Sequence, residues 1–119
     1  MKVLLIDDNY EITGMISFFL ESNNISCKIA NNGKEGLERI KSEKYDVILL
    51  DLTMPQFSGF DIFDYLKLND LLKTNNVLLF TTSNTSKENI QEMVKEGAKG
   101  ILKKPISIDL IIEAIEKFR

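Results

Sequence analysis

Acidic side chains follow two apolar runs of this sequence, at the point where each run ends. Residues 3–6 are followed by Asp7 and Asp8, and residues 45–50 are followed by Asp51. If the two runs are neighbouring parallel strands, the three carboxylates meet at one edge of a sheet. Each pair of charges then repels by about 1 kcal/mol or more, so the cluster needs a compensating charge. A hard divalent cation, which prefers oxygen ligands, would supply it.

Hydroxyl and ammonium groups follow two later apolar runs in the same way. Thr81 and Thr82 come after residues 77–80, and Lys103 and Lys104 come after residues 100–102. Ligands of open parallel sheets bind outside the carboxyl ends of the strands. We therefore expect acids, hydroxyls and a lysine to gather at one edge of the sheet.

Segments with strand and helix periodicity alternate along the chain, and this alternation predicts the fold. Strands are predicted over 2–6, 25–30, 45–50, 77–80 and 100–102. Helices are predicted over 9–21, 34–42, 57–68, 86–96 and from 108 onward, with a loop over 70–76. Strict alternation indicates an α/β fold: a doubly wound, five-stranded parallel sheet with helices on both faces.

Composition limits the classes of function. A chain of 119 residues with 44% hydrophobic content suits one domain, 1–119. The net charge of −3 argues against binding to nucleic acid or to an anionic membrane. No apolar stretch is long enough to span a membrane and no signal-peptide pattern is visible, so we expect a cytoplasmic protein. The chain has no histidine, so any imidazole chemistry must come from a partner.

Several motifs together resemble the receiver domain of two-component response regulators, the CheY-like family, over the whole chain. They are the acidic pair Asp7-Asp8, Asp51 followed by Met54-Pro55, Gly59 after that turn, Thr82 at the family's spacing before a lysine, and Lys104-Pro105. Thr81 misses that spacing by one residue, so Thr82 is preferred. Each motif is weak alone, but their order and spacing are highly specific. The resemblance implies a flavodoxin-like (βα)5 fold with strand order 2-1-3-4-5.

The resemblance also implies roles for individual residues. Asp51 would be the nucleophile that accepts a phosphoryl group as an acyl phosphate. Mg²⁺ would be held by Asp7, Asp8, Asp51 and the backbone carbonyl of Thr53. Lys104 would contact a phosphoryl oxygen, and a cis peptide bond would join it to Pro105. Thr82 would donate its hydroxyl to the same phosphoryl group.

As a member of this family, the chain would be a phosphorylation-activated switch rather than a turnover enzyme. Its phosphoryl donor would be the phosphohistidine of a histidine kinase or of a histidine phosphotransfer protein, which fits the absence of histidine here. A downstream protein target would bind through the face formed by residues 86–119.

Two positions depart from the family pattern. Ile101 stands where most receivers have Tyr or Phe, and isoleucine is stiff at χ1. Ser83 stands where the residue after the switch threonine is usually Ala. In most receivers the aromatic ring at the first position turns inward when the domain switches, and the shorter, stiffer Ile101 cannot make that movement. Ser83 at the second position still leaves room for a phosphoryl group.

Other interpretations remain open. Asp51 could be a strand-end residue that hydrogen-bonds a turn, and Asp8 or Asn9 could cap the first helix. Thr81 fits the description of an ordinary β-branched strand residue. A flavin-binding electron carrier has the same topology, but it needs a phosphate loop rich in Ser, Thr and Gly; a colourless protein would exclude it. A Mg²⁺-dependent aspartyl phosphatase would need a substrate cap, and a turnover assay with small phosphoesters would detect it.

Overall fold

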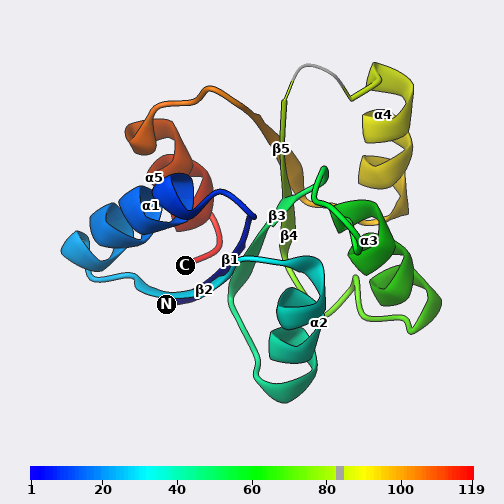
Figure 1. Ribbon diagram of the computed structural model, residues 1–119, viewed down its shortest axis with the longest axis horizontal. Helices are drawn as coiled ribbons and strands as arrows, with labels where there is room; N and C mark the ends of the chain where they lie inside the picture. The colour runs from blue at the N-terminus through cyan, green and yellow to red at the C-terminus, as the bar shows by residue number, and fades with distance from the viewer. Residues whose placement is uncertain (83–84) are drawn as a thin grey trace.

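A parallel sheet between two layers of helices forms the protein, as the computed structural model in Figure 1 shows. The structure describes residues 1–82 and 85–119. The strands are β1 (Lys2–Ile6), β2 (Ser26–Ala30), β3 (Val47–Asp51), β4 (Val77–Thr81) and β5 (Gly100–Lys103). The helices are α1 (Tyr10–Ser22), α2 (Gly33–Ser42), α3 (Gly59–Leu68), α4 (Lys87–Glu96) and α5 (Ile108–Glu116). The strand order is β2-β1-β3-β4-β5, which confirms the predicted topology.

Alternating side chains of the strands fill two separate cores. Leu4 and Ile6 of β1 pack toward α2, α3 and α4, whereas Val3 and Leu5 pack toward α1 and α5. Figure 1 shows these two helix layers on opposite faces of the sheet. Burying a side chain of this size contributes about 1.5–3 kcal/mol. Two covered faces explain why the central strands read as continuous apolar runs rather than as alternating ones.

The structure differs from the predicted elements mainly at their ends. The third strand begins at Val47 rather than at residue 45, and it includes Asp51. Asn9, Ser86 and Ser107 precede their helices as N-caps, and each side chain accepts a backbone N–H of the first turn. Within the part of the chain that the structure describes, no helix is long and apolar enough to cross a membrane.

The buried stripe of α1 is rotated from the predicted one. The helical spacing of Ile12, Ile16 and Phe19, with Met15 and Leu20 beside them, predicts the apolar stripe. Ile16 and Leu20 are buried, whereas Phe19 is 39% exposed and Met15 is half-exposed. Phe18 is also exposed, and its ring packs edge-on against that of Phe19. Two aromatic rings therefore remain at the surface of this helix, in its C-terminal half.

Candidate functional site

One face of the sheet carries most of the predicted site residues past the ends of the strands. Along a strand, alternate residues point to the same face. The side chain of Asp51 therefore points to the same face of the sheet as Val47 and Leu49, which pack toward α1 and α5. Thr82 likewise points to the same face as Phe80, and Lys104 to the same face as Leu102. By the same rule, the side chain of Thr81 points to the opposite face of the sheet, toward α4.

Lys104 joins the ends of three strands. Its Nζ donates to Asp7 Oδ2 at 2.6 Å and lies 3.5 Å from Asp51 Oδ1. Asp7 and Asp51 are almost completely buried, and the lysine side chain is only 16% exposed. Phe80 lies beneath the ammonium group, with its ring centroid 4.7 Å from Nζ. The resemblance also implied a cis Lys104–Pro105 bond, and the structure contains one.

The surroundings of Asp51 disfavour the charged form of its carboxyl group. Burial, together with the neighbouring charge of Asp7, raises its pKa to about 6. Lys104 and a 3.3 Å hydrogen bond from the Thr53 backbone N–H act in the opposite direction without offsetting the burial. Additional positive charge beside Asp51 would therefore favour its ionised, nucleophilic form.

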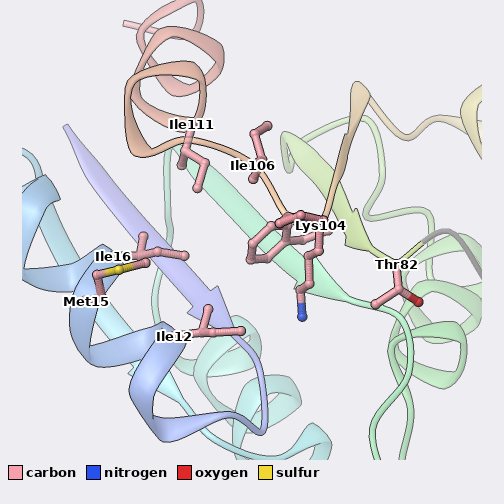
Figure 2. A pocket seen from close by; sticks show the side chains of 9 residues that line it. Ile12, Met15, Ile16, Thr82, Lys104, Ile106 and Ile111 are labelled. Atoms are coloured by element: carbon pink, nitrogen blue, oxygen red, sulfur yellow. The ribbon is translucent and has the colours of Figure 1, made fainter.

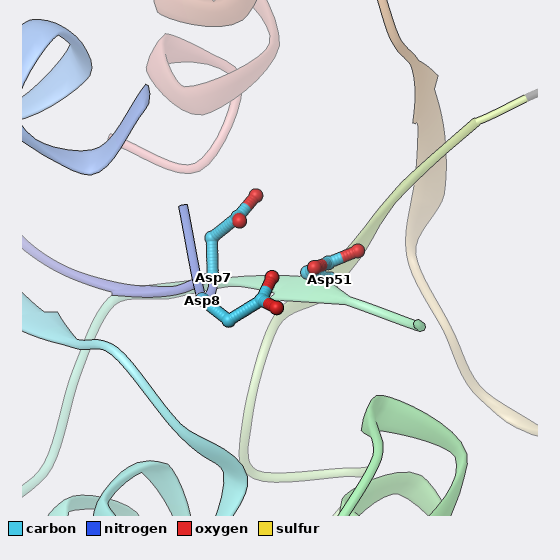
Figure 3. Close-up of side chains that lie close together, drawn as sticks. All are labelled: Asp7, Asp8 and Asp51. Carbon is cyan, nitrogen blue, oxygen red and sulfur yellow. The ribbon is translucent and has the colours of Figure 1, made fainter. Parts of the chain in front are cut away.

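The three predicted acids do lie together. Carboxylate oxygens of Asp7, Asp8 and Asp51 are all within 4.8 Å of one another, and Figure 3 shows them gathered above the ends of β1 and β3. Asp8 is exposed, so the group has one side open to solvent. Two buried carboxylates, one accessible carboxylate and space for water match the oxygen donor set that Mg²⁺ prefers. Thr53 is exposed on the loop that follows Asp51.

A close backbone approach holds Asp51 in place. The first residue of α3, Gly59, packs so tightly that an added Cβ would lie 2.0 Å from the Asp51 carbonyl oxygen. Any larger residue would push α3 away from the end of β3. This contact gives a physical reason for Gly59 in the motif.

Asp7 is fixed in part by the start of α1. Its Oδ1 accepts the backbone N–H of Asn9 at 2.9 Å. The Asn9 side chain then accepts the N–H groups of Glu11 and Ile12, so Asn9, and not Asp8, caps the helix. The capping interpretation and the metal interpretation are therefore compatible, because capping leaves Asp8 available.

Two residues near Asp7 were missed from the sequence. Asn31 Nδ2 donates to the Asp7 carbonyl and to Thr13 Oγ1, both at 3.0 Å. Thr13 is buried on α1, and no role was predicted for it from the sequence. The available signal was Asn31 itself, a polar residue directly past β2, the strand that pairs with β1.

Thr82 and Thr81 share the wall of one cavity but otherwise have different neighbours. Thr82 and Lys104 line another cavity, whereas the Thr81 hydroxyl is 2.7 Å from that of Thr85. The cavity that the two threonines share, of about 180 Å³, lies between β4, α4 and β5, and Ile101 is part of its wall. The predicted small residue Ser83 lies outside the described residues.

The cavity shared by Thr82 and Lys104 is a mostly apolar hollow. It has a volume of about 520 Å³ and runs from the site between α1 and the segment joining β5 to α5 (Figure 2). It is lined by Ile12, Met15, Ile16, Phe80, Thr82, Lys104, Pro105, Ile106 and Ile111.

Comparison with known proteins identifies the family. A family model described as the response regulator receiver domain matches residues 3–116. The chain belongs to this family. The receiver domain is the phosphorylation-controlled switch of two-component signalling, and neither a flavin carrier nor a phosphatase finds support among its relatives.

Relatives and solved structures agree with this assignment. The transcriptional regulatory protein CrdR of Helicobacter pylori is 31% identical over 117 residues, 98% of this receiver domain and 54% of CrdR. The receiver domain of Francisella response regulator 1452 is 34% identical with a TM-score of 0.88, covering 98% and 94% of the two chains. Chemotaxis protein CheY4 of Vibrio cholerae is 30% identical with a TM-score of 0.86, covering 99% and 98%. The chain thus spans about half the length of CrdR, and less of some other curated relatives.

Proposed function

We propose that this chain is a receiver domain over residues 1–119 that accepts a phosphoryl group on Asp51. The observation that carries the proposal is the position of Lys104, whose Nζ contacts Asp7 and lies 3.5 Å from Asp51. A mobile ammonium group beside a buried carboxylate can pair with that carboxylate at rest and with a phosphoryl oxygen afterwards. The chain would act as a switch in the cytoplasm, not as a turnover enzyme.

Mg²⁺ is the cofactor that best fits the cluster of acids. Asp7, Asp8 and Asp51 would hold it, with the backbone carbonyl of Thr53 as a further ligand. When bound, Mg²⁺ supplies positive charge that offsets repulsion between the carboxylates and an incoming phosphoryl group. The raised pKa of Asp51 supports this assignment, because its carboxylate lacks sufficient positive charge in the protein alone.

The phosphoryl group would come from a phosphorylated partner, and the chain's own residues would carry out its transfer. An Asp51 oxygen attacks phosphorus, the phosphorus–nitrogen bond of the partner's phosphohistidine breaks, and the bonding electrons leave with the imidazole. Lys104 would bind one phosphoryl oxygen, and the Thr82 hydroxyl would donate to another. Hydrolysis of the acyl phosphate by water would return the Asp51 carboxylate and release inorganic phosphate.

Receiver domains of response regulators work with histidine kinases and downstream effectors. Here the donor would be a histidine kinase or a histidine phosphotransfer protein. The apolar cavity beside Lys104 supports docking of such a partner, because its wall includes Met15, whose side chain is half-exposed on α1. A partner that covers this surface would bring its histidine to the edge where Asp51 lies.

The downstream target would bind the face formed by residues 86–119. Thr82 leads from β4 toward α4, so movement of its hydroxyl would be transmitted first to this face. The domain itself would bind neither nucleic acid nor membrane, since its net charge is −3.

Phosphorylation by acetyl phosphate in Mg²⁺ tests the proposal. Intact mass spectrometry should show one added phosphoryl group, which Asp51→Asn should abolish. Asp46→Asn is a matched control, because Asp46 lies at the opposite end of β3 and hydrogen-bonds the backbone of Lys2. Equal labelling of wild type and Asp51→Asn would refute the assignment. Purified protein should also be colourless and should not turn over small phosphoesters.

A further inference from the structure

The backbone carbonyl of Asp7 has an unusual hydrogen-bond partner. The pairing of β1 with β2 continues one residue past the end of β1, since the Asp7 N–H donates to the Ala30 carbonyl at 3.1 Å. In a regular parallel ladder, a backbone N–H of the neighbouring strand would donate next to the Asp7 carbonyl. Here the side-chain amide of Asn31 takes that place at 3.0 Å.

The path of the chain explains this replacement. Asn32 turns away from the strand to become the N-cap of α2, and its side chain accepts the Glu35 N–H at 2.8 Å. Without another donor, the carbonyl of fully buried Asp7 would be left unsatisfied. An unsatisfied buried group of this kind costs about 1–3 kcal/mol. The Asn31 amide removes this cost while allowing α2 to begin.

Thr13 fixes the amide in its orientation. The Asn31 Nδ2 donates to Thr13 Oγ1 at 3.0 Å, and the Thr13 hydroxyl in turn donates to the Tyr10 carbonyl at 3.3 Å. Thr13 is only 1% exposed, so water competes little for these bonds. The amide therefore joins the start of α2 and the first turns of α1 to the end of β1.

We propose that Asn31, held by Thr13, is a positioning residue for the pair of cation ligands Asp7 and Asp8. The Asp7 carbonyl belongs to the planar peptide group that carries the Asp8 nitrogen. Fixing that oxygen fixes the plane that links the two acids, and so the direction of the exposed Asp8 side chain. The inference rests on the proposed Mg²⁺ site, and it assigns two further residues to it.

Mg²⁺ titration by calorimetry tests the inference. Asn31→Leu keeps the size of the side chain but removes the donor, and it should weaken Mg²⁺ binding about 10–100-fold, as loss of a residue that orients metal ligands does. Asn76→Leu is the matched control, because Asn76 Nδ2 donates to the Asp46 carbonyl at 2.9 Å at the opposite end of the sheet. That variant should keep the wild-type affinity even if it is destabilised equally.

Variants of Thr13 provide a second measurement that does not depend on Asn31→Leu folding. Thr13→Val should weaken Mg²⁺ binding by a smaller factor, and Thr13→Ser should restore it. If wild type and Asn76→Leu bind Mg²⁺ but Asn31→Leu and Thr13→Val bind it equally well, the positioning role is wrong. If wild type itself binds no Mg²⁺, the proposed cation site is wrong instead.

Discussion

The two sides of the Asp51 site are built differently. On the β1 side, Asp7 is buried and is hydrogen-bonded at its N–H, its carbonyl and both carboxylate oxygens. On the β4 side, Thr82 borders two cavities, of about 520 and 180 Å³. The β1 side is thus preorganised for a ligand, whereas the β4 side has room for side chains to move.

This difference bears on the question raised by Ile101. A cavity already lies beside Ile101, so a change on this side does not require an aromatic ring to vacate or fill space. The Thr81 and Thr85 hydroxyls, 2.7 Å apart, join β4 to the segment that leads into α4. We therefore expect β4 and this segment to move together, while the β1 side stays fixed.

The largest expected effect comes from removing Lys104, which links the two sides. Lys104→Met should reduce the free energy of unfolding without Mg²⁺ by about 3 kcal/mol or more, because Asp7 and Asp51 lose their buried partner. Urea denaturation at pH 7 measures this. Lys103→Met is the control, since Lys103 is exposed and its replacement should change stability by about 0.5 kcal/mol or less. Similar losses in both variants would contradict a central role for Lys104.

The second prediction concerns pH. The pKa of Asp51 is about 6 in the folded protein against an ordinary 3.8, so the folded state binds this proton more tightly. The stabilising contribution is complete below about pH 4 and is lost as pH rises through 6, a change of about 3 kcal/mol. In EDTA, the stability of wild type relative to Asp51→Asn should therefore fall over this range. A constant difference would show that Asp51 titrates normally.

Bound Mg²⁺ should offset the loss of stability that ionisation of Asp51 causes. At a hundredfold excess over its Kd, Mg²⁺ should stabilise wild type by about 2.7 kcal/mol. Asp8→Ala should weaken that effect and, without Mg²⁺, should stabilise the fold by about 1 kcal/mol through reduced repulsion. Thermal melts with and without Mg²⁺ check both statements. Asp64→Ala, which removes an exposed acid of α3 outside the cluster, should behave like wild type.

The sequence was sufficient for the parts of the site that depend on strand order and side-chain alternation. Asp7, Asp8, Asp51 and Lys104 meet because each lies at the end of a strand of a parallel sheet. Asn31 was not predicted, because its role depends on Asn32 leaving the strand to cap α2, which begins at Gly33, and on a side chain replacing the backbone donor that is lost. The exposure of Phe19 was missed for a related reason: apolar spacing alone does not set the rotation of a helix against the sheet.

The smallest expected effect is at Thr81, on the β4 side. Thr81→Val removes the hydroxyl bond to Thr85 and should cost about 1 kcal/mol, whereas Thr81→Ser should cost less. In wild type, beryllofluoride should shift amide NMR signals of Thr85, α4 and Ile101, because a ligand that Thr82 and Lys104 bind better in one state favours that state.

The shifts in α4 should shrink in Thr81→Val, since the loss of this bond uncouples β4 from Thr85, and they should return in Thr81→Ser. Signals of Asp7 and Asn31 should change in all three proteins, because they report occupancy of the site rather than movement on the β4 side. If residues 86–101 stay silent in wild type while Asp7 responds, phosphorylation does not act through this face. If Thr81→Val shows full shifts in α4, movement passes from Thr82 along another path, and the Thr81–Thr85 bond serves stability alone.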